Sequence, residues 1–466
     1  MSQPVTFLTR AEALIGTHEA DAIDAGARLF LDRRDQRFDE FPMVEALRDR
    51  ARAIRLRSLR ELDLLLARFG DEVEAAGGRV HWAGDAAEAN DIVRGILDAA
   101  GARLVVKSKS MVSEEIELNH HLEQAGIGVV ESDLGEFIAQ LAGDTPSHII
   151  APVMHMTRED VGRLFAEKLG VPYTDDPIAL NRIARAHLRD VFLQADAGIS
   201  GVNLAIAESG SLVLVTNEGN GRLTTTAPRV HIALMGMERI VPDWEDAAVI
   251  LETLARSATG QHLSVYTNVI TGPRKAGEPD GPDEVHVVVI DNGRSEILAG
   301  ETAEILACIR CGACLNACPV FRTAGGHAYG SVYSGPMGSI VTPGLLGMEP
   351  WWELPYASTL CGACEEVCPV RIEIPRMLLQ LRARAAAEGR LPAWLDRGLR
   401  RYTHTVTHPA HWARAKTWAA RLSGPISRGG WIRRLPGPGR GWTTSRDLRR
   451  PARESFHDWW QANRGP

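Results

Sequence analysis

Residues 308–319 read Cys308-Ile-Arg-Cys311-Gly-Ala-Cys314-Leu-Asn-Ala-Cys318-Pro319, and residues 361–369 read Cys361-Gly-Ala-Cys364-Glu-Glu-Val-Cys368-Pro369. These two runs contain all seven cysteines of the chain. The first has the spacing C-x2-C-x2-C-x3-C-P, which in bacterial ferredoxins supplies three close thiolates to one iron–sulfur cluster and a fourth to another. Gly312 and Gly362 suit such loops, because a residue without a Cβ lets the backbone approach a cluster closely. The two runs therefore predict a pair of iron–sulfur clusters.

Zinc sites and disulfide bonds are the other common uses of closely spaced cysteines. Paired C-x2-C motifs can bind zinc, but a zinc site requires neither the third close cysteine nor the Cys-Pro ending. Disulfides are disfavoured because the number of cysteines is odd and the N-terminal residues carry no secretory-signal pattern. Iron–sulfur binding is the interpretation that accounts for all of these features.

The second run has one cysteine fewer than the first. When the runs are aligned on their Cys-x3-Cys-Pro ends, Ser358 stands where the complete pattern has a cysteine. Crossed ligation then assigns the first cluster to Cys308, Cys311, Cys314 and Cys368, and the second cluster to Cys318, Cys361 and Cys364. We expect the first to be a [4Fe-4S] cluster. The second is expected to be either a [4Fe-4S] cluster with a non-cysteine ligand or water on one iron, or a [3Fe-4S] cluster. A helix cap or simple filler is the favoured role of Ser358, and the missing cluster ligand is the alternative.

The composition is that of a globular protein with several domains. The chain has 466 residues, of which 45% are hydrophobic and 24% are charged, which is enough for two or three domains with substantial cores. No window approaches 18 consecutive apolar residues, so we expect no transmembrane span. The missing signal pattern and the cluster motifs predict a cytoplasmic protein, which its partners could hold peripherally at the membrane.

Charge is distributed unevenly along the chain. Residues 376–466 contain nineteen Lys and Arg but five Asp and Glu, a net charge of +14, so residues 1–375 carry −21. Seven of the eleven tryptophans fall in this basic segment, namely Trp394, Trp412, Trp418, Trp431, Trp442, Trp459 and Trp460. Basic and aromatic residues together can bind nucleic acid, but no binding module is visible and the tryptophans are spaced like packing residues. We expect no nucleic-acid partner. Docking on an acidic surface is the favoured interpretation, with partial disorder near PGPGRG as the alternative.

Hydrophobic periodicity divides the chain into four parts. Residues 1–78 read as helices, including a long one with an Arg-rich, solvated face that stops at Gly70. Residues 79–292 alternate strand-like and helical runs, which predicts an α/β domain with a largely parallel sheet. The strand-like runs are RVHWAG, RLVVKS, IGVVES, HIIAPVM, SLVLVT, HIALM and EVHVVVID. Residues 293–385 predict a helical ferredoxin-like domain that holds the cysteines, and residues 386–466 form a basic, Trp- and Arg-rich extension.

Two loops of the α/β domain carry candidate binding residues. In the first, Lys107 and Lys109 follow a strand and precede a helix that Ser113 is expected to cap, a position where an anion can bind. In the second, Glu208 precedes a strand whose end, residues 216–222, has glycines and asparagines suited to turns with positive φ. A solvated lysine and ordinary β-turns are the simpler interpretations of these loops.

The 42 residues between Cys318 and Cys361 are too many for a compact ferredoxin hairpin. They include GGHAYGSVYSGPMGSIVTPGLLG, whose Gly and Pro content predicts loop rather than helix. We interpret this segment as a cover that keeps water away from the clusters. His327 within it, and His155 in the preceding domain, are expected to be structural rather than ligands.

Several segments together resemble a known bacterial family. They are VVKSKSMVSEEIELN, ESDLGEFIAQLAGDTPSHI, ISGVNLAIAESGSLVLVTNEGNGR, ARSATGQ, GPRKAGEPDGPDEVHVVVIDNGRS, CGACLNACPV, GGHAYGSVYSGPMG and YASTLCGACEEVCPV. On these segments, which run between residues 79 and 375, the chain resembles the lactate utilisation protein B family. Members of that family are iron–sulfur subunits of bacterial L-lactate-oxidising complexes.

This resemblance implies a LUD domain, similar in fold to CoA transferases and ribose-phosphate isomerases, followed by two ferredoxin-type iron–sulfur sites at the seven cysteines. It also implies two partners, a cysteine-rich heterodisulfide-reductase-like subunit and a second LUD-domain subunit. The family's C-terminal Trp- and Arg-rich extension covers residues 386–466. The implied function is electron transfer through two clusters in a system that oxidises L-lactate to pyruvate.

Three functions of different kinds stay open at the level of sequence. The first is the electron relay, in which the chain is not catalytic alone, because residues 293–380 contain no acid–base pair for a 2-hydroxy acid. The second is a catalytic LUD domain that binds a CoA ester or a phosphate ligand. There Glu208 would correspond to the nucleophilic glutamate of CoA transferases, and Lys107 and Lys109 would hold the anion. The third is a redox-sensing scaffold for assembly.

Overall fold

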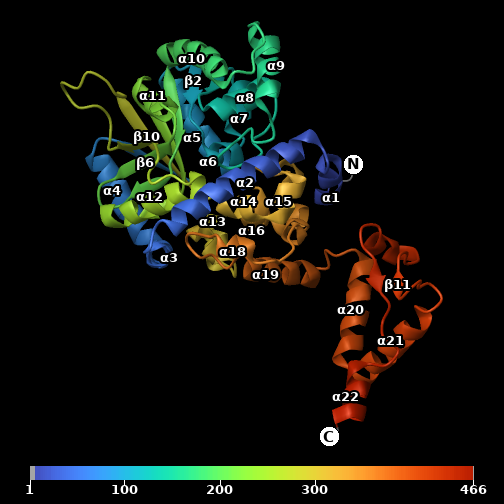
Figure 1. The fold of residues 1–466 in the computed structure, drawn as a ribbon. Coiled ribbons are helices and arrows are strands. Elements are labelled where there is room, and N and C mark those ends of the chain that lie inside the picture. Colours follow the sequence, from blue (N-terminus) through green and yellow to red (C-terminus); the bar gives the residue numbers. More distant parts are fainter. Residues whose placement is uncertain (1–5, 465–466) are drawn as a thin grey trace. The chain divides into compact units, whose positions relative to one another are not determined.

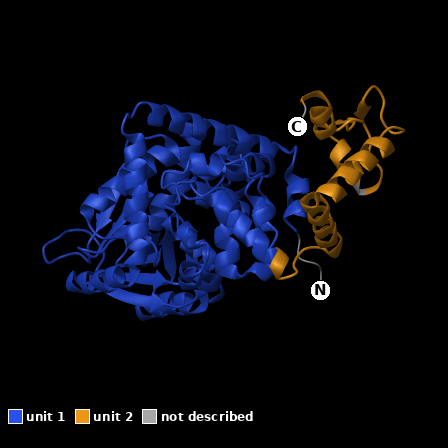
Figure 2. Cartoon of the chain, turned by 90° about the horizontal axis from the view of Figure 1, so that it is seen from below, with its two compact units in different colours: residues 1–385 blue, residues 386–466 orange. Residues whose placement is uncertain are grey.

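The computed structural model describes residues 6–464, which form two compact units (Figure 2). The first unit ends at Ala385 and the second begins at Ala386. The first contains both the α/β domain and the cysteine-bearing helical segment (Figure 1). These two parts therefore belong to one compact body, and the candidate sites all lie within it.

Six parallel strands form the central sheet of the first unit. They are β1 (Arg79–Ala83), β2 (Leu104–Lys107), β3 (Gly128–Glu131), β4 (Ala197–Gly201), β7 (Val230–Gly236) and β10 (Glu284–Ile290). Their spatial order is β1-β10-β7-β4-β2-β3, and every neighbouring pair is parallel. From β2 the chain moves outward to β3, whereas from β4 it moves the other way, to β7. The switch point of this topology therefore lies between β2 and β4, and ligands of such sheets bind beyond the carboxyl ends of the strands at that point.

Both faces of the central sheet are covered. Val288 and Ile290 of β10 pack in a core with helices on one face, and Val287 and Val289 pack in a separate core on the other. This burial on both faces explains why the strand is a continuous apolar run. The helices that follow β1, β2 and β3 are α5 (Ala86–Ala99), α6 (Met111–Glu115), α7 (Leu118–Gln124), α8 (Leu134–Ala142), α9 (Arg158–Leu169) and α10 (Pro177–Gln194).

A smaller sheet lies on the second face. Its strands are β5 (Leu204–Ile206), β6 (Ser211–Thr216), β8 (Ile240–Val241) and β9 (Tyr266–Ile270), in the order β8-β5-β6-β9. The pairs β5–β6 and β6–β9 are antiparallel and β5–β8 is parallel. Helices α11 (Asn220–Thr226) and α12 (Trp244–Thr259) follow β6 and β8. The run SLVLVT thus forms a strand as predicted, but in this mixed sheet rather than in the parallel one.

Four helices come before the first strand, namely α1 (Phe7–Leu14), α2 (His18–Asp39), α3 (Val44–Arg60) and α4 (Leu62–Ala75). Helix α2 packs on α12 of the α/β domain and on α14 and α15 of the cysteine segment (Figure 1). The N-terminal helices therefore join the two parts of the first unit. The helix stop predicted at Gly70 is wrong, because the helix breaks earlier, at Glu61, and α4 continues through Gly70.

The cysteine segment is helical, as predicted. Its elements are α13 (Arg294–Ala299), η1 (Ala303–Ala307), α14 (Ala313–Ala317), α15 (Pro319–Ala324), η2 (His327–Tyr329), α16 (Gly335–Leu346), α17 (Met348–Trp351), η3 (Leu354–Tyr356), α18 (Ala363–Glu366) and α19 (Ile374–Ala387). Helix α16 contradicts the loop predicted for the Gly- and Pro-rich stretch. Residues 335–343 are all buried, and a Cβ at Gly338 would lie 2.0 Å from the carbonyl oxygen of Tyr333. Tight packing, rather than helix propensity, selects these glycines.

Three local predictions fail for identifiable reasons. The run HIIAPVM is not a strand but a series of bends and turns, which place the side chain of His148 against Asn316 of α14. The cap of α6 is Ser110, whose hydroxyl accepts from the amide of Ser113. The glycines at positions 219 and 221 both lack positive φ, because one precedes α11 and the other lies within it.

The second unit is helical with one short hairpin. Its elements are α20 (Ala393–Thr407), α21 (Pro409–Leu422), β11 (Trp431–Ile432), η4 (Gly437–Thr443), β12 (Leu448–Arg449) and α22 (Phe456–Arg464). The seven tryptophans of this region do not form a core, since each is between 42% and 71% exposed. Their spacing was therefore a poor guide to packing. A bend at Pro436 and helix η4 occupy residues 436–441, the stretch named above as PGPGRG.

The fold class is confirmed, with a parallel α/β domain followed by a helical cysteine segment and a C-terminal extension. Among residues 6–464, no helix is long and apolar enough to cross a bilayer.

Candidate functional site

The seven cysteines fall into two spatial groups. Four of them line one small cavity, together with Ile149 and Met337, and these are Cys308, Cys311, Cys314 and Cys368. The remaining three lie near one another, since burial and then the charges of Cys318 and Cys361 raise the pKa of Cys364, which also lies close enough to Cys314 of the first group to raise its pKa. These two sets are the ones that crossed ligation requires. Cys368 of the second run thus lies with three cysteines of the first.

The two cysteine loops repeat one backbone conformation 50 positions apart. Arg310 and Leu360, which directly precede Cys311 and Cys361, have φ of 59° and 55°. Gly312 and Gly362, which follow them, have φ of 78° and 88° and begin the short helices α14 and α18. A non-glycine residue at positive φ is uncommon, so its occurrence at equivalent places marks the loops as two copies of one cluster-binding turn.

Ser358 occupies the place of a cysteine in the second copy. In the first loop the amide of Arg310 donates to Sγ of Cys308 at 3.4 Å. In the second, the amide of Leu360 donates to Oγ of Ser358 at 3.1 Å. The serine hydroxyl is therefore held by the same backbone contact as the thiol of the first loop. The alignment that paired these two residues in the sequence has a direct structural counterpart.

Burial shapes the chemistry of these thiols. Burial raises the pKa of Cys364 to about 12 and that of Cys368 to about 11, so a thiolate is unfavourable there without a cation. Backbone amides point at the sulfurs, as Ile372 N does at Cys368 Sγ, 3.3 Å away. Iron supplies the cation that such thiolates need, and amide donors to sulfur are a known determinant of cluster potentials. The donor set therefore fits iron–sulfur clusters.

Arginines from distant parts of the chain surround the first group of cysteines. Arg48 of α3 donates to the carbonyl of Cys368 at 2.9 Å, and Arg34 of α2 donates to that of Val367 at 2.9 Å. Arg55 is fully buried and donates to the carbonyl of Ala307, next to Cys308. Burial lowers the pKa of Arg55 to about 10, so this side chain is still charged at neutral pH. The Arg-rich face of the N-terminal helices, predicted to be solvated, is instead turned toward the cysteine segment.

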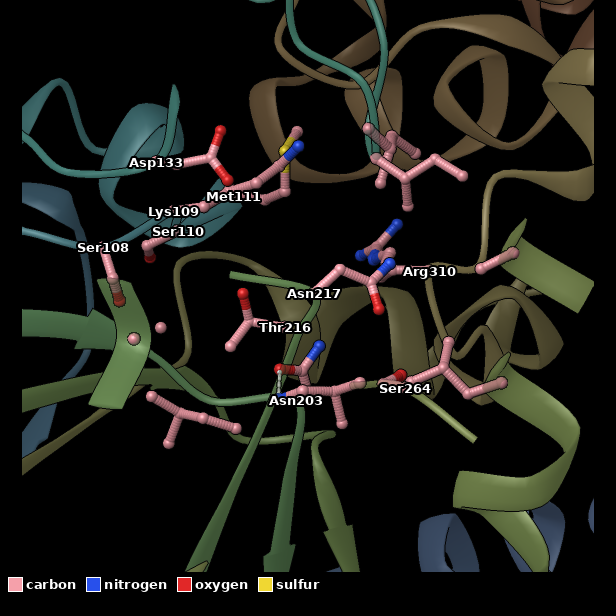
Figure 3. Close-up of a pocket in the computed structure, with 18 of the residues that line it drawn as sticks. Ser108, Lys109, Ser110, Met111, Asp133, Asn203, Thr216, Asn217, Ser264 and Arg310 are labelled. Atoms are coloured by element: carbon pink, nitrogen blue, oxygen red, sulfur yellow. Dashed lines mark hydrogen bonds between the residues drawn. The ribbon is translucent and has the colours of Figure 1, made fainter. Parts of the chain in front are cut away.

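A cavity of about 460 Å³ lies beside this cysteine group, at the carboxyl ends of β2 and β4. Figure 3 shows Lys109, after β2, and Arg310, from the first cysteine loop, among the side chains that line it. Asn203 follows β4, Thr216 is the last residue of β6, and Asn217 follows it. The loop after β2 and the end of β6, which the sequence noted separately, thus meet in one cavity at the switch point of the sheet, whereas residues 207–211 before β6 do not line it.

Of the three binding residues predicted from the sequence, only one lines the cavity. Nζ of Lys107 is buried between Glu114 and Glu131, at 2.7 and 2.8 Å, so its charge is already compensated and it does not line the cavity. Lys109 does line it. Glu208 accepts from the amide of Trp244 at 2.8 Å, at the start of α12, and is not among the lining residues.

The two singled-out histidines make structural contacts. His155 is buried, bonds to Ser147 and Asp144 at 2.8 and 3.0 Å, and packs edge-on against His327. Nε2 of His327 bonds to the carbonyl of Thr145 at 2.8 Å. Both therefore hold the loop after α8 against the cysteine segment.

Sequence reasoning missed three lining residues, Arg239, Glu218 and Arg310. Arg310 lies inside the first cysteine run, but the motif places no requirement on that position. Glu218 lies in the loop that was noted only for its turns. The side chain of Glu218 is exposed at the mouth of the cavity, but desolvation by the surrounding wall, with a contribution from the carboxylate of Asp133, raises its pKa to about 7. A pattern of residue types cannot reveal such a shift, because it depends on desolvation by distant segments.

Comparison with known proteins agrees with both parts of the first unit. A model of the LUD domain matches residues 66–290, and a model of the 4Fe-4S dicluster domain matches residues 304–372. Lactate utilization protein B of Bacillus licheniformis is 44% identical over 445 residues, which cover 95% of this chain and 93% of that protein. The protein of the same name from Shouchella clausii is 46% identical over 419 residues, 90% of this chain and 88% of the relative. The chain belongs to the lactate utilization protein B family.

Two further proteins are similar to this family member. The uncharacterized electron transport protein YkgF of Escherichia coli is 43% identical over 428 residues, which cover 92% of this chain and 90% of that protein. A crystal structure of a DUF162 family protein from Deinococcus radiodurans covers 49% of this chain and 98% of its own, with 15% identity and a TM-score of 0.28. The resemblance seen in the sequence is thus confirmed at the level of the family, with its LUD domain and its iron–sulfur domain.

The raised pKa of Glu218 predicts a pH dependence of stability. Its pKa is 4.5 in the unfolded chain and about 7 in the fold, so between these values the native state binds more protons than the unfolded state. Stability therefore falls as the pH rises through this window, by a small amount because the side chain is exposed and water screens its charge. Glu218→Gln cannot ionise, so we expect its melting temperature to exceed that of the wild type at pH 8 and to approach it at pH 5.

Thermal unfolding of the anaerobically purified protein at both pH values measures this difference. Glu301→Gln, at an exposed carboxylate, is the matched control and should follow the wild type. Equal pH dependence of the Glu218→Gln variant and the wild type would contradict the assignment.

Proposed function

We propose that this protein is an electron-transfer subunit of an L-lactate-oxidising system and relays electrons through two clusters. The grouping of the cysteines is the observation that carries this proposal. Cys368 joins the first-run cysteines and Cys318 lies with Cys361 and Cys364, so the runs interleave and the clusters they hold must be close neighbours. Short distances between clusters are what a relay of single electrons needs.

The substrate assignment rests on the family. The relatives from Bacillus licheniformis and Shouchella clausii are named for lactate utilization. The relative from Escherichia coli is described as an electron transport protein, which agrees with a redox role. The partners we propose, a cysteine-rich heterodisulfide-reductase-like subunit and a second LUD-domain subunit, follow from the same family resemblance. A cytoplasmic location, with any membrane attachment through those partners, fits the oxidation-sensitive clusters.

The alternative of a CoA-transferase-like LUD domain finds no support at Glu208. That carboxylate is engaged at the start of α12 and lies outside the large cavity. We therefore keep the electron relay as the function, with lactate oxidation itself requiring more than this chain.

Replacement of a cluster ligand separates the relay from a scaffold. Cys311→Ser should remove the first cluster. The complex reconstituted from this variant and its partners should no longer reduce a dye with L-lactate, while the partners should still co-purify with the variant. The isolated wild-type chain should reduce no dye with L-lactate. Full activity of the complex with Cys311→Ser would favour a scaffold, and dye reduction by the isolated chain would contradict the assignment of catalysis to the assembled system.

We further propose that the first cluster is [4Fe-4S] with four thiolates and that the second is [4Fe-4S] with Ser358 as its fourth ligand. The equivalent amide contacts of Ser358 and Cys308 support this choice over a three-iron cluster. A serine oxygen is a harder ligand than a thiolate, so the two clusters are expected to differ in potential.

EPR of the oxidised, anaerobically purified protein tests the role of Ser358. The wild type should show no three-iron signal, Ser358→Cys should retain a four-iron cluster at a changed potential, and Ser358→Ala should lose one iron and gain the three-iron signal. Ser427→Ala, in the second unit, is the matched control and should resemble the wild type. A three-iron signal in the wild type, or none in Ser358→Ala, would rule out the serine ligand.

A further inference from the structure

The large cavity has no role in the proposed relay, yet it is built like a binding site. It lies at the switch point of a parallel sheet, where ligands of α/β proteins bind. Its volume of about 460 Å³ falls within the range typical of pockets for small organic molecules. Its walls come from the sheet, from α2, from α12 and from the first cysteine loop. The cavity is thus shared by the LUD domain and the iron–sulfur domain.

The charges that face this cavity call for an anion. Nζ of Lys109 is buried and has no hydrogen-bond partner among the described residues. Nε of Arg310 also has no hydrogen-bond partner there, although Nη1 of the same guanidinium donates to Sδ of Met337 and Nη2 lies 3.7 Å from Glu238. A buried cation without a partner is costly, and Lys107 shows the contrast, since its ammonium contacts two carboxylates. Nζ of Lys109 and Nε of Arg310 are therefore donors that no described residue uses.

Acidic and apolar side chains that line the cavity indicate which class of anion it binds. Asp133 and Glu218 also line the cavity, so a ligand with both an anionic group and a hydrogen-bond donor fits better than a bare anion. Apolar side chains cover much of the remaining wall, namely those of Met111, Ile149, Leu214 and Leu254. Apolar walls with a few polar anchors are typical of sites for organic molecules rather than inorganic ions.

Arg310 connects this cavity to the first cluster site. Its side chain lines the cavity, while its backbone amide donates to Sγ of Cys308. Its guanidinium also stacks on Tyr333, 4.5 Å from the ring centroid, and lies 3.7 Å from Glu238. An anion bound at Arg310 would therefore change the electrostatic field at the thiolates of that cluster.

We propose that the cavity binds an organic anion, with its carboxylate or phosphate on Lys109 and Arg310 and its body against the apolar wall, and that the first cluster senses this occupancy through Arg310. The binding of an organic anion goes beyond the electron relay and does not depend on it, whereas the sensing rests on the first cluster of the proposed relay. Binding to the cavity and electron transfer through the clusters are separate measurements, so either can fail without the other.

Isothermal titration of the anaerobically purified, cluster-loaded chain tests the site directly. Flavin mononucleotide serves as the organic phosphate, L-lactate as the organic carboxylate, and inorganic phosphate as the bare anion. At least one organic probe should bind, and more tightly than inorganic phosphate. Failure of both organic probes to bind, or binding of inorganic phosphate with equal affinity, would overturn the proposal.

Variants of one lysine locate the binding. Lys109→Met should weaken binding of the organic probe by about 10- to 100-fold, the usual effect of losing a charged hydrogen bond, and Lys109→Arg should restore most of it. Lys168→Met is the matched control, because Lys168 lies in α9 outside the cavity, and it should bind like the wild type. Equal affinity of Lys109→Met and the wild type would overturn the site.

A potentiometric EPR titration tests the coupling to the cluster. Saturation with the bound probe should shift the potential of the first cluster in the wild type and in Lys168→Met, with a smaller shift of the second cluster. An unchanged potential of the first cluster in the saturated protein would overturn the sensing role.

Discussion

The structure depends on how the negative charge of clustered thiolates is accommodated inside a protein core. Thiolates are unfavourable where Cys364 and Cys368 lie, because burial raises the pKa of both thiols. Metal is one source of compensation, and the arginines around the first group are the other. Arg48 and Arg55 come from one N-terminal helix and contact carbonyls beside or within the cysteine runs. The N-terminal helices are thus needed for the cluster sites as much as for the fold.

This constraint also explains why the LUD domain and the cysteine segment form one compact unit. Helix α2 packs on both of them, and Arg239, after β7, donates to the carbonyl of Cys308 at 3.5 Å. The end of the parallel sheet is therefore tied to the first cysteine loop. As a result, a cavity at the switch point of the sheet shares Arg310 with the site of a cluster. In our proposals, this arrangement places a pocket for an organic ligand next to a one-electron carrier.

The parts of this account that could be predicted from the sequence are those with short-range signals. The cysteine spacing predicts the crossed groups, and the apolar runs of β7 and β10 predict buried parallel strands. Contacts between distant segments could not be predicted in this way. Arg48 and Cys368 are separated by 320 positions, and the buried helix α16 forms from a stretch whose composition predicts a loop. Lys107 and Lys109 looked alike in sequence, but buried carboxylates hold one and leave the other facing the cavity.

The crossed assignment of the cysteines is the central claim, and EPR of single cysteine-to-serine variants, oxidised and after dithionite, tests it most directly. Our account predicts that Cys368→Ser loses the same cluster signal as Cys311→Ser, although these residues belong to different runs. It also predicts that Cys318→Ser loses the signal that Cys361→Ser loses. Loss of one common signal in Cys368→Ser and Cys361→Ser, with the other signal intact, would contradict the account, because each run would then hold its own cluster.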